Sequence, residues 1–327
     1  MSETILKVEN LVTAFTTDRG VVRPVNGVSF EVKKGRTLAI VGESGSGKSV
    51  TSLSVMRLIP ENNGKIEQGS IQFEGHELAQ ASKREMQYLR GNRMAMIFQE
   101  PMTALNPVYT VGEQIAEVLR LHEGLSRKAA HEKAVSMLDK VHIPDPEARA
   151  RCYPHELSGG MRQRVMIAMS LACNPKLLIA DEPTTALDVT IQAQVLRLMR
   201  QLQEELGTAI IFITHDLGVV AEVADDVMVM YCGNIVEQGT VFEVFEKPKH
   251  PYTIGLMQSL PKLTDNKAAP LEAIKGMVPS LFDLPDGCRF STRCEHVKGI
   301  CTSTPSLIKI GDTHSAACHL LEQSASS

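Results

Sequence analysis

The chain alternates short apolar runs with longer amphipathic segments. Four apolar runs have the length of strands, and polar or glycine-rich residues follow each one; they occupy residues 38–41, 94–98, 177–181 and 209–214. Short apolar runs between turn residues predict buried strands of a central sheet.

The segments between these runs show helical spacing. After Asp188, apolar residues recur at the i, i+4, i+7 and i+8 spacing of one buried helix face: Ile191, Val195, Leu198, Met199, Leu202 and Leu206. A second amphipathic segment follows Ser126, whose hydroxyl suits the N-cap position. Residues 101–173 are mostly helical in pattern and lie between two predicted strands, which predicts a helical lobe inserted into an α/β core.

The length of the chain predicts more than one folding unit. At roughly 150 residues per domain, 327 residues give about two domains. The first 255 residues alternate strand and helix patterns without a repeat, which indicates one α/β domain. The composition changes near Pro261, and residues 262–280 lack sustained periodicity. We therefore predict an α/β domain over residues 1–255, followed by a linker and a C-terminal extension over residues 256–327.

Charge and hydropathy exclude several classes of protein. The chain has 34 Lys and Arg and 38 Asp and Glu residues, so no global basic field would attract nucleic acid or anionic lipid. The longest apolar stretches, at residues 209–213 and 227–231, are far shorter than the roughly 20 residues that span a bilayer. The acidic N-terminus lacks the features of a signal peptide. We expect a cytosolic chain without a direct membrane span.

A nucleotide-binding pattern follows the first predicted strand. Residues 42–49 have the sequence G-E-S-G-S-G-K-S, which fits the P-loop pattern before a helix that begins near Lys48. In such a loop the backbone N–H groups converge on the phosphates of ATP, the lysine reaches the β- and γ-phosphate oxygens, and the serine hydroxyl ligates Mg²⁺. The alternative, an ordinary glycine-rich turn, is disfavoured by the flanking strand and helix. The predicted ligands are Gly42, Ser44, Gly45, Gly47, Lys48 and Ser49.

Two carboxylates end another predicted strand. Asp181 and Glu182 follow the apolar run L-L-I-A, where a parallel strand would face a ligand crevice. Asp181 would hold the Mg²⁺ shell, and Glu182 would orient and deprotonate the water that attacks the γ-phosphate. Solvated acids at a strand end are the alternative. The P-loop in the same chain favours the catalytic interpretation.

A third motif resembles a known family. Residues 157–164, L-S-G-G-M-R-Q-R, are similar to the signature of the nucleotide-binding subunits of ATP-binding cassette (ABC) transporters. Ser158 and the amides of Gly159 and Gly160 would cap a helix over residues 161–173 and form a second anion site, which cannot reach the P-loop of its own chain. The resemblance implies an α/β fold: a P-loop ABC-type domain with a RecA-like core, an antiparallel β subdomain and an inserted helical subdomain.

The resemblance also implies an assembly. In the family, two subunits sandwich two ATP molecules head to tail, and each site pairs one P-loop with the signature of the partner. Met161 replaces the more usual glutamine of the motif, so the backbone contacts stay possible while a side-chain hydrogen bond to the partner's nucleotide is in doubt.

Further residues match positions of the family pattern. Gln99 resembles the glutamine that contacts Mg²⁺ and water and senses the membrane subunits, and His215 resembles the switch histidine at the γ-phosphate. Asp188 resembles the residue that crosses the dimer interface, although it could also be only the N-cap of its helix. Phe15 stands where the family places an aromatic residue that stacks on adenine, while a phenylalanine near a strand is often a core residue.

Two tracts indicate the kind of transporter. Residues 98–107 and 249–253, together with the C-terminal extension, resemble subunits of dipeptide and oligopeptide importers. An importer of nickel or another small solute is the alternative, although the nickel importers are typically shorter. The implied partners are a second ATPase subunit in a heterodimer, two transmembrane permease subunits and, indirectly, a peptide-binding protein. The implied location is the cytoplasmic face of the inner membrane, as a peripheral subunit.

Four cysteines in the extension suggest a metal site. They have the spacing C-x5-C-x6-C-x16-C in a segment with too little apolar content for a core of its own: Cys288, Cys294, Cys301 and Cys318. Four thiolates suit Zn²⁺ or an iron–sulfur cluster, and the absence of C-x2-C pairs disfavours zinc. The family resemblance favours a structural 4Fe-4S cluster over Zn²⁺ and over thiols without a metal. Three histidines could substitute for the fourth ligand, although a surface position is the favoured interpretation of each: His296, His314 and His319.

A soluble ABC protein that acts on ribosomes or DNA is a more remote alternative. Such proteins usually carry two cassettes or a long coiled-coil insertion, and this sequence shows neither. The acidic net charge also gives no nucleic-acid footprint.

Overall fold

The computed structural model describes residues 3–99, 104–184, 187–259 and 274–322. Residues 100–103 of the importer-like tract and residues 262–273 of the predicted linker lie outside this range. The chain divides into two compact units. Unit 1 comprises Met1–Leu6, Val32–Arg36 and Gln80–Ile213, and unit 2 comprises Lys7–Glu31, Thr37–Ala79 and Thr214–Ser327.

The sheet of unit 1 is parallel. Strands β6 (Met94–Ile97), β7 (Leu177–Asp181) and β8 (Ala209–Ile213) pair in the order β8-β7-β6. Every residue of β7 and β8 is buried, which explains why these strands are apolar throughout rather than alternating. The predicted strands are confirmed, and two of them end one residue earlier than their apolar runs.

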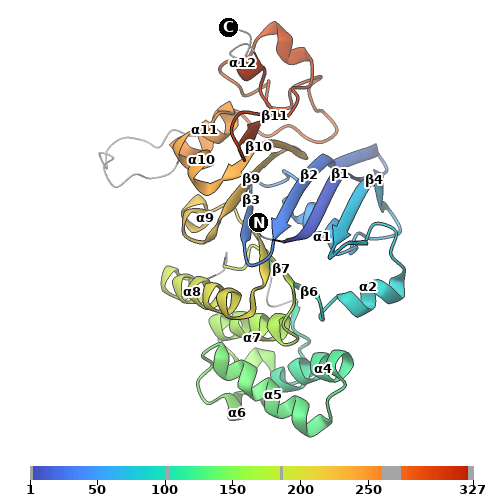
Figure 1. Cartoon of the computed structure of the whole chain (residues 1–327), viewed down its shortest axis with the longest axis vertical. Coiled ribbons are helices and arrows are strands. Elements are labelled where there is room, and N and C mark those ends of the chain that lie inside the picture. Colours follow the sequence, from blue (N-terminus) through green and yellow to red (C-terminus); the bar gives the residue numbers. More distant parts are fainter. Residues whose placement is uncertain (1–2, 100–103, 185–186, 260–273, 323–327) are drawn as a thin grey trace. The chain divides into compact units, whose positions relative to one another are not determined.

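Helices make up most of the rest of unit 1. Helices α4, α5 and α7 pack against one another, and this group lies within the predicted helical lobe (Figure 1). The helices of unit 1 have the bounds α2 (Lys83–Leu89), α4 (Val111–Glu123), α5 (Arg127–Lys140), α6 (Pro146–Arg149), α7 (Gly159–Leu171) and α8 (Val189–Leu206), and a 3-10 turn η1 covers Pro154–Glu156.

The N-caps follow the sequence signals. The Ser126 hydroxyl accepts a hydrogen bond from the N–H of Ala129 at 3.3 Å, and Asp188 accepts one from the N–H of Ile191 at 3.0 Å. Each cap satisfies a first-turn donor that has no partner inside its helix. The predicted starts of α5 and α8 are therefore confirmed.

Unit 2 contains a sheet in the order β2-β1-β4-β5, with β4 and β5 antiparallel. Most of the long strands β1 and β2 belongs to this unit. These strands have the bounds β1 (Thr4–Thr17), β2 (Gly20–Lys33), β4 (Gly64–Phe73) and β5 (His76–Glu77). The antiparallel β subdomain is thereby confirmed.

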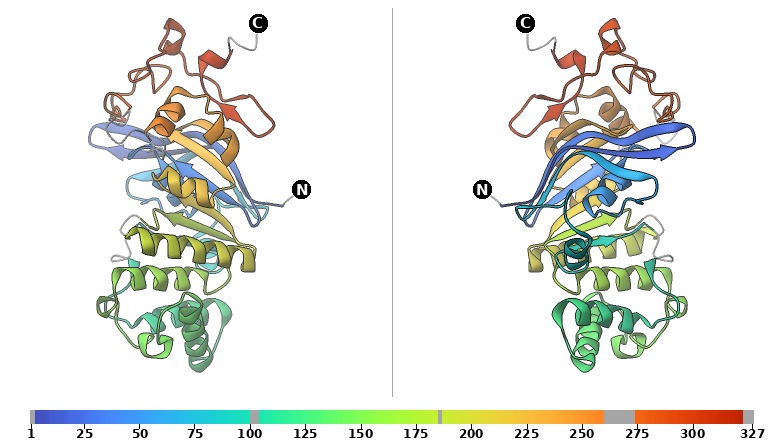
Figure 2. Two further views of the ribbon diagram at one scale, coloured as in Figure 1. Left: turned by 90° about the vertical axis from the view of Figure 1, so that its left-hand side faces the viewer. Right: turned by 90° about the vertical axis from the view of Figure 1, so that its right-hand side faces the viewer.

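Strands from distant parts of the sequence build the other sheet of unit 2 (Figure 2). Here β3 (Thr37–Val41) runs parallel to β9 (Asp226–Tyr231), with Leu38 opposite Asp226. The order continues as β9-β10-β12-β11, and these pairs are antiparallel. The added strands are β10 (Asn234–Thr240), β11 (Ile308–Lys309) and β12 (Ser315–Ala316).

Short helices complete unit 2. They are α1 (Lys48–Val55), α9 (Leu217–Val223), α10 (Val241–Glu246), α11 (Pro251–Gln258) and α12 (His319–Glu322), and a 3-10 turn η2 covers Gly299–Thr302. Helix α1 follows β3 directly, so the glycine-rich residues 42–47 form the connection between strand and helix.

The C-terminal extension shares the core of unit 2. Strand β12 pairs with β10, where Ala316 lies opposite Glu237. Phe290 is 4% exposed and packs against Tyr231 and Tyr252, with ring centroids 5.2 and 5.4 Å away. The extension therefore buries apolar surface against the sheet rather than around a core of its own.

Candidate functional site

The P-loop, residues 42–49, leads from β3 into α1. Gly42 and Gly47 have φ angles of 151° and 104°, where side chains are rarely tolerated. A Cβ at Gly42 would lie 2.2 Å from the carbonyl oxygen of Met230, and one at Gly47 would lie 2.1 Å from that of Pro24. Neighbouring backbone thus presses on the loop from two sides, and only glycine fits there.

Lys48 is directed toward the loop itself. Its ammonium group donates hydrogen bonds to the carbonyl oxygens of Gly42 at 2.7 Å and Glu43 at 3.0 Å. The residue is only 6% exposed. The loop therefore holds a positive charge at a fixed place, as binding of a polyphosphate requires.

The start of α1 is suited to an anion. Gly47 is its N-cap and supplies no side-chain acceptor to the N–H groups of the first turn. The Ser46 hydroxyl is buried and has no hydrogen-bond partner among the described residues. These donors, with the helix dipole and the Lys48 ammonium, fit a bound phosphate group.

A second cluster lies at the end of β7 in unit 1. Asp181, the last residue of the strand, is 5% exposed. Glu182 has a φ angle of 47°, a conformation that costs free energy in a non-glycine residue, and its N–H donates to the carbonyl of Ile213. The amide nitrogen of Gln99 donates to the Glu182 carboxylate at 3.1 Å. The structure therefore brings together two residues, Gln99 and Glu182, that the sequence analysis assigned separately.

The signature residues lie at the N-terminus of α7 in unit 1. Ser158 is the N-cap, and its hydroxyl accepts a hydrogen bond from the N–H of Met161 at 3.3 Å. A Cβ on Gly159 would meet no atom within 4 Å, whereas one on Gly160 would lie 3.1 Å from Ile191 of α8. Gly159 therefore leaves open space at the helix start, and Gly160 lets α7 approach α8. The helix begins two residues earlier than the sequence predicted.

The remaining predicted residues are placed as follows. His215 is exposed just after β8, and it belongs to unit 2. Asp188 is exposed and caps α8 in unit 1. Phe15 of β1 is half-buried in unit 2, and its ring lies next to Gly64, where a Cβ would come within 2.8 Å of the ring.

One P-loop residue, Glu43, has two partners outside the loop, and none of the three was predicted from the sequence. The N–H of Glu43 donates to the hydroxyl of Tyr252 at 2.8 Å, and the Glu43 carboxylate pairs with the guanidinium of Arg293 at 2.6 and 3.1 Å. Glu43 and Arg293 are 250 positions apart, so no local pattern connects them. The available signal was the tract at residues 249–253, which contains Tyr252 and which only the family resemblance had marked.

The predicted 4Fe-4S cluster is wrong, and so is its Zn²⁺ alternative. Among the described residues, no three or more His, Cys, Asp or Glu side chains are grouped so that they could hold a metal ion. Burial raises the pKa of the Cys288 and Cys294 thiols, which favours the protonated form over the thiolate that binds metals. The described cysteines form no disulfide bond; those of the extension are Cys288, Cys294, Cys301 and Cys318.

The predicted substitute ligands have other roles. His314 is bound to Glu237 at 2.7 Å, and the ring of His319 lies 3.0 Å from the carbonyl oxygen of Ser303. His296 is exposed at the rim of a cavity. The prediction that the extension has no core of its own is confirmed. The extension packs on the sheet of unit 2, and this packing takes the place of a metal.

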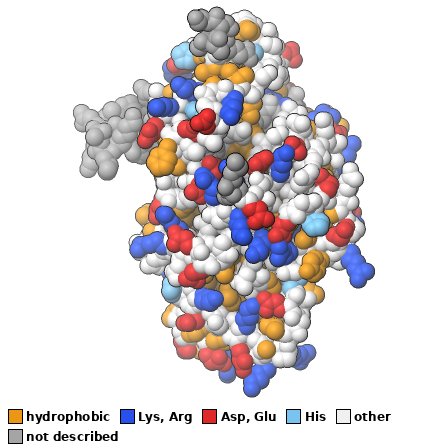
Figure 3. All heavy atoms as spheres, in the orientation of Figure 1, with side chains coloured by type: hydrophobic (Ala, Val, Ile, Leu, Met, Phe, Trp, Pro, Cys, Tyr) orange, Lys and Arg blue, Asp and Glu red, His pale blue; other side chains and the backbone are white. Residues whose placement is uncertain are grey.

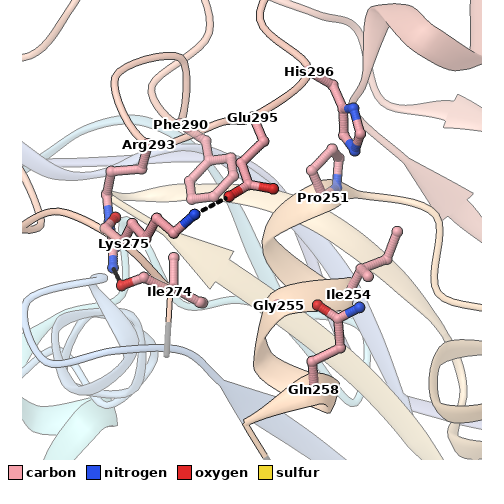
Figure 4. A pocket seen from close by; sticks show the side chains of 10 residues that line it. All are labelled: Pro251, Ile254, Gly255, Gln258, Ile274, Lys275, Phe290, Arg293, Glu295 and His296. Atoms are coloured by element: carbon pink, nitrogen blue, oxygen red, sulfur yellow. Dashed lines mark hydrogen bonds and ion pairs between the residues drawn. The ribbon is translucent and has the colours of Figure 1, made fainter. Parts of the chain in front are cut away.

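A cavity of about 450 Å³ lies between α11 and the extension in unit 2 (Figure 4). Lys275 and Glu295, two of the residues that line it, form an ion pair of 2.9 Å. The residues that line it are Pro251, Ile254, Gly255, Gln258, Ile274, Lys275, Phe290, Arg293, Glu295 and His296.

Among the described residues, every helix is too short or too polar to cross a membrane. On the face drawn in Figure 3, lysine and arginine side chains are interspersed with aspartate and glutamate side chains, and no continuous basic area is visible among its described residues.

Two family models match the chain. Residues 25–185 match the model described as ABC transporter, a range that includes the P-loop, the signature and both carboxylates at the end of β7. Residues 236–301 match the model for the C-terminal region of oligopeptide/dipeptide transporters, which includes Tyr252 and Arg293.

Known relatives match the chain over nearly its whole length. A probable peptide ABC transporter ATP-binding protein, y4tR of Sinorhizobium fredii, is 54% identical and covers 97% of this chain and 95% of its own length. The oligopeptide transport ATP-binding protein OppD of Bacillus subtilis is 55% identical and covers 98% of this chain and 90% of its own length.

A solved structure shares the cassette fold. The dimeric, post-hydrolysis structure of the ATP-binding cassette MJ0796, bound to ADP and Pi, has a TM-score of 0.65 and 26% sequence identity. It aligns with 72% of this chain and 98% of its own length, so part of this chain extends beyond the shared fold.

Proposed function

Because the chain belongs to the family of ATP-binding subunits of peptide ABC transporters, we propose that it binds ATP at the P-loop and hydrolyses it to power the import of dipeptides or oligopeptides. The observation that carries this proposal is the loop itself. It combines glycine-only backbone, a Lys48 ammonium held in place and an uncapped helix start, which together fit a triphosphate.

Binding uses residues of unit 2. The N–H groups of the loop around Ser44 and Gly45 bind phosphate oxygens, and Lys48 neutralises the β- and γ-phosphates. Phe15 stacks on the adenine ring. Ser49 would ligate Mg²⁺ in this unit, and Asp181 and Gln99 of unit 1 are its other proposed ligands. When bound, Mg²⁺ neutralises charge on the phosphate oxygens.

Hydrolysis uses Glu182 as the general base. Its carboxylate takes a proton from the attacking water while the oxygen of that water bonds to the γ-phosphorus and the bond to the β-phosphate oxygen breaks. The hydrogen bond from Gln99 orients the carboxylate, and the strained backbone at Glu182 fixes its direction. His215 steadies the water and the γ-phosphate.

A second ATPase subunit completes each site. Ser158, Gly159 and Gly160 present the N-terminus of α7 to the nucleotide in the P-loop of the partner subunit, and Asp188 crosses the interface. The exposure of Ser158 and the open space beside Gly159 support this role. Met161 contributes its backbone only.

The partners follow from the division of labour in the family. We propose a heterodimer with a second ATPase subunit, bound to two permease subunits at the cytoplasmic face of the inner membrane. A peptide-binding protein delivers the substrate to the permease subunits, so peptide selectivity lies outside this chain. The names of two relatives, a probable peptide ABC transporter ATP-binding protein and an oligopeptide transport ATP-binding protein, support the role in peptide transport.

The test is a single substitution with a matched control. Glu182→Gln removes the base and keeps the hydrogen bond to Gln99, so the assembled transporter should lose at least about a hundredfold in ATP turnover while it still binds ATP. Glu204→Gln alters an exposed glutamate of α8 that pairs with Arg200, and turnover should not change. For both variants, steady-state phosphate release measures ATP turnover and a titration with ATP measures binding. Undiminished turnover in Glu182→Gln would contradict the assignment.

A further inference from the structure

The backbone N–H, the backbone carbonyl and the carboxylate of Glu43, the second residue of the P-loop, each form a hydrogen bond or an ion pair. Its N–H donates to Tyr252, its carbonyl accepts from Lys48, and its carboxylate pairs with Arg293. Two of these partners lie more than 200 positions along the chain, in α11 and in the C-terminal extension. The conformation of the loop at Glu43 is therefore set by tertiary contacts as well as by its glycines.

The side chain of Arg293 is also held by contacts other than its ion pair with Glu43. Its side chain is 3% exposed, and its guanidinium also donates to the carbonyl oxygens of Ile274 at 3.3 Å and Lys275 at 3.1 Å. The fork of the guanidinium then meets both oxygens of the Glu43 carboxylate, the geometry that gives the strongest ion pairs. A preorganised pair that is buried on its arginine side holds a backbone segment in place, in contrast to a mobile pair on the surface.

Tyr252 holds the other side of the same residue. It is fully buried, and its ring packs against Tyr231 with centroids 4.7 Å apart. Burial raises its pKa well above the usual value, so its hydroxyl stays neutral and accepts the N–H of Glu43. Tyr252 is placed by α11, whose N-cap is His250: the imidazole Nδ1 accepts the N–H of Tyr252 at 3.0 Å.

We propose that Arg293 and Tyr252 are positioning residues of the nucleotide site, through which the C-terminal extension and α11 set the affinity of the P-loop for ATP. They act through Glu43, whose carbonyl oxygen is one of the two that hold the Lys48 ammonium. If Glu43 shifts, the Lys48 ammonium and the neighbouring loop N–H groups lose their alignment with the phosphates. This inference rests on the proposed function of the loop as an ATP site.

The test is a double-mutant cycle in the full chain, with Mg²⁺-ATP as the probe in a calorimetric titration. Arg293→Gln and Glu43→Gln should each weaken ATP binding by about tenfold, a typical size for coupling between sites. The double variant should bind no more weakly than either single variant, since both remove the same link. In steady-state hydrolysis the KM for ATP should rise while kcat stays close to that of the wild type.

Two further variants keep the test decisive if Arg293→Gln does not fold. Arg293→Lys keeps the charge but not the two-pronged contact, and should restore part of the affinity. Tyr252→Phe keeps the aromatic packing and removes only the acceptor for Glu43, and should weaken ATP binding several-fold. The matched control is Lys309→Gln, which alters an exposed charged residue of the same extension, in β11, and should leave ATP affinity unchanged.

The outcomes separate this inference from the proposed function. If the wild-type chain does not bind ATP, or Lys48→Ala binds it as tightly as the wild type, the ATP site itself is wrong. If Lys48→Ala loses binding while Arg293→Gln and Tyr252→Phe bind like the wild type, only the positioning role is overturned. Additive losses in the Arg293 and Glu43 cycle would also overturn it, because Arg293 would then act by another route.

Discussion

The P-loop and the C-terminal extension belong to the same unit, but different forces give them their shape. In the P-loop, Gly42 and Gly47 are required because the backbone φ is positive at both positions and neighbouring carbonyls leave no room for a Cβ. In the extension, the side chains find their partners in distant segments, as Phe290 does on Tyr231 and Tyr252.

This difference determines how each region responds to change. A substitution at a P-loop glycine acts locally, through a steric clash or a strained φ angle. A substitution in the extension acts on a shared core that includes the strand before the P-loop, because Phe290 and Val41 belong to one buried cluster. The extension therefore contributes to the buried core of unit 2, and it stabilises the rest of that unit.

The largest expected effect is at Phe290. Phe290→Ala removes a ring that is 4% exposed and should lower the free energy of unfolding by about 3 to 4 kcal/mol, because the aromatic cluster keeps the cavity that the ring leaves. Chemical denaturation followed by tyrosine fluorescence measures this loss.

Phe282→Ala is the matched control for that substitution. Phe282 lies in the same extension, is 39% exposed and has Arg19 over its ring at 4.5 Å. Its loss should cost about 1 kcal/mol or less, the size of one exposed cation–π contact. Equal losses at both positions would mean that the extension is not held by a shared aromatic core.

A smaller effect should appear on acidification, through His250. Burial lowers the pKa of His250 to about 3, and its Nδ1 accepts a hydrogen bond, which requires the unprotonated nitrogen. Between that pKa and the ordinary value near 6.5, the unfolded chain binds a proton that the folded chain does not, so stability falls as the pH drops through this window.

The expected size is about 2 kcal/mol between pH 6.5 and pH 5, since each pH unit in the window costs about 1.4 kcal/mol per proton. In His250→Gln, which can still accept a hydrogen bond, the midpoint of unfolding should depend less on pH over the same interval. An identical pH dependence in the two proteins would show that His250 titrates normally in the folded state.

The contrast between the two regions also explains what could be predicted from the sequence. The strands, the helical lobe, the N-caps of α5 and α8 and the family follow from local patterns, because periodicity and capping act over a few residues. For the candidate site, the local P-loop pattern and the pair Asp181 and Glu182 could be recognised in the same way, and their catalytic roles stay predictions.

What could not be predicted depends on contacts across the sequence. The sequence shows four cysteines near one another and a segment with little apolar content, and a metal is the simplest local explanation. It does not show that Phe290 enters the core of another segment, or that Arg293 reaches Glu43. Such partners are separated by tens to hundreds of residues, and only the folded sheet brings them together.

The smallest expected effect on stability concerns the exposed one of two ion pairs that the extension forms. The pair of Arg293 and Glu43 is buried on the arginine side, with 3% of that side chain exposed, whereas Lys275 and Glu295 are 84% and 69% exposed in theirs. Water and salt screen the exposed pair, and two long side chains lose conformational freedom when they form it, so its net contribution is close to zero. Lys275→Gln should therefore leave the midpoint of thermal unfolding unchanged at both low and high ionic strength. A clear loss of stability that disappears in high salt would mean that the pair of Lys275 and Glu295 stabilises the extension. Surface charge would then add to the stabilisation that the aromatic core provides.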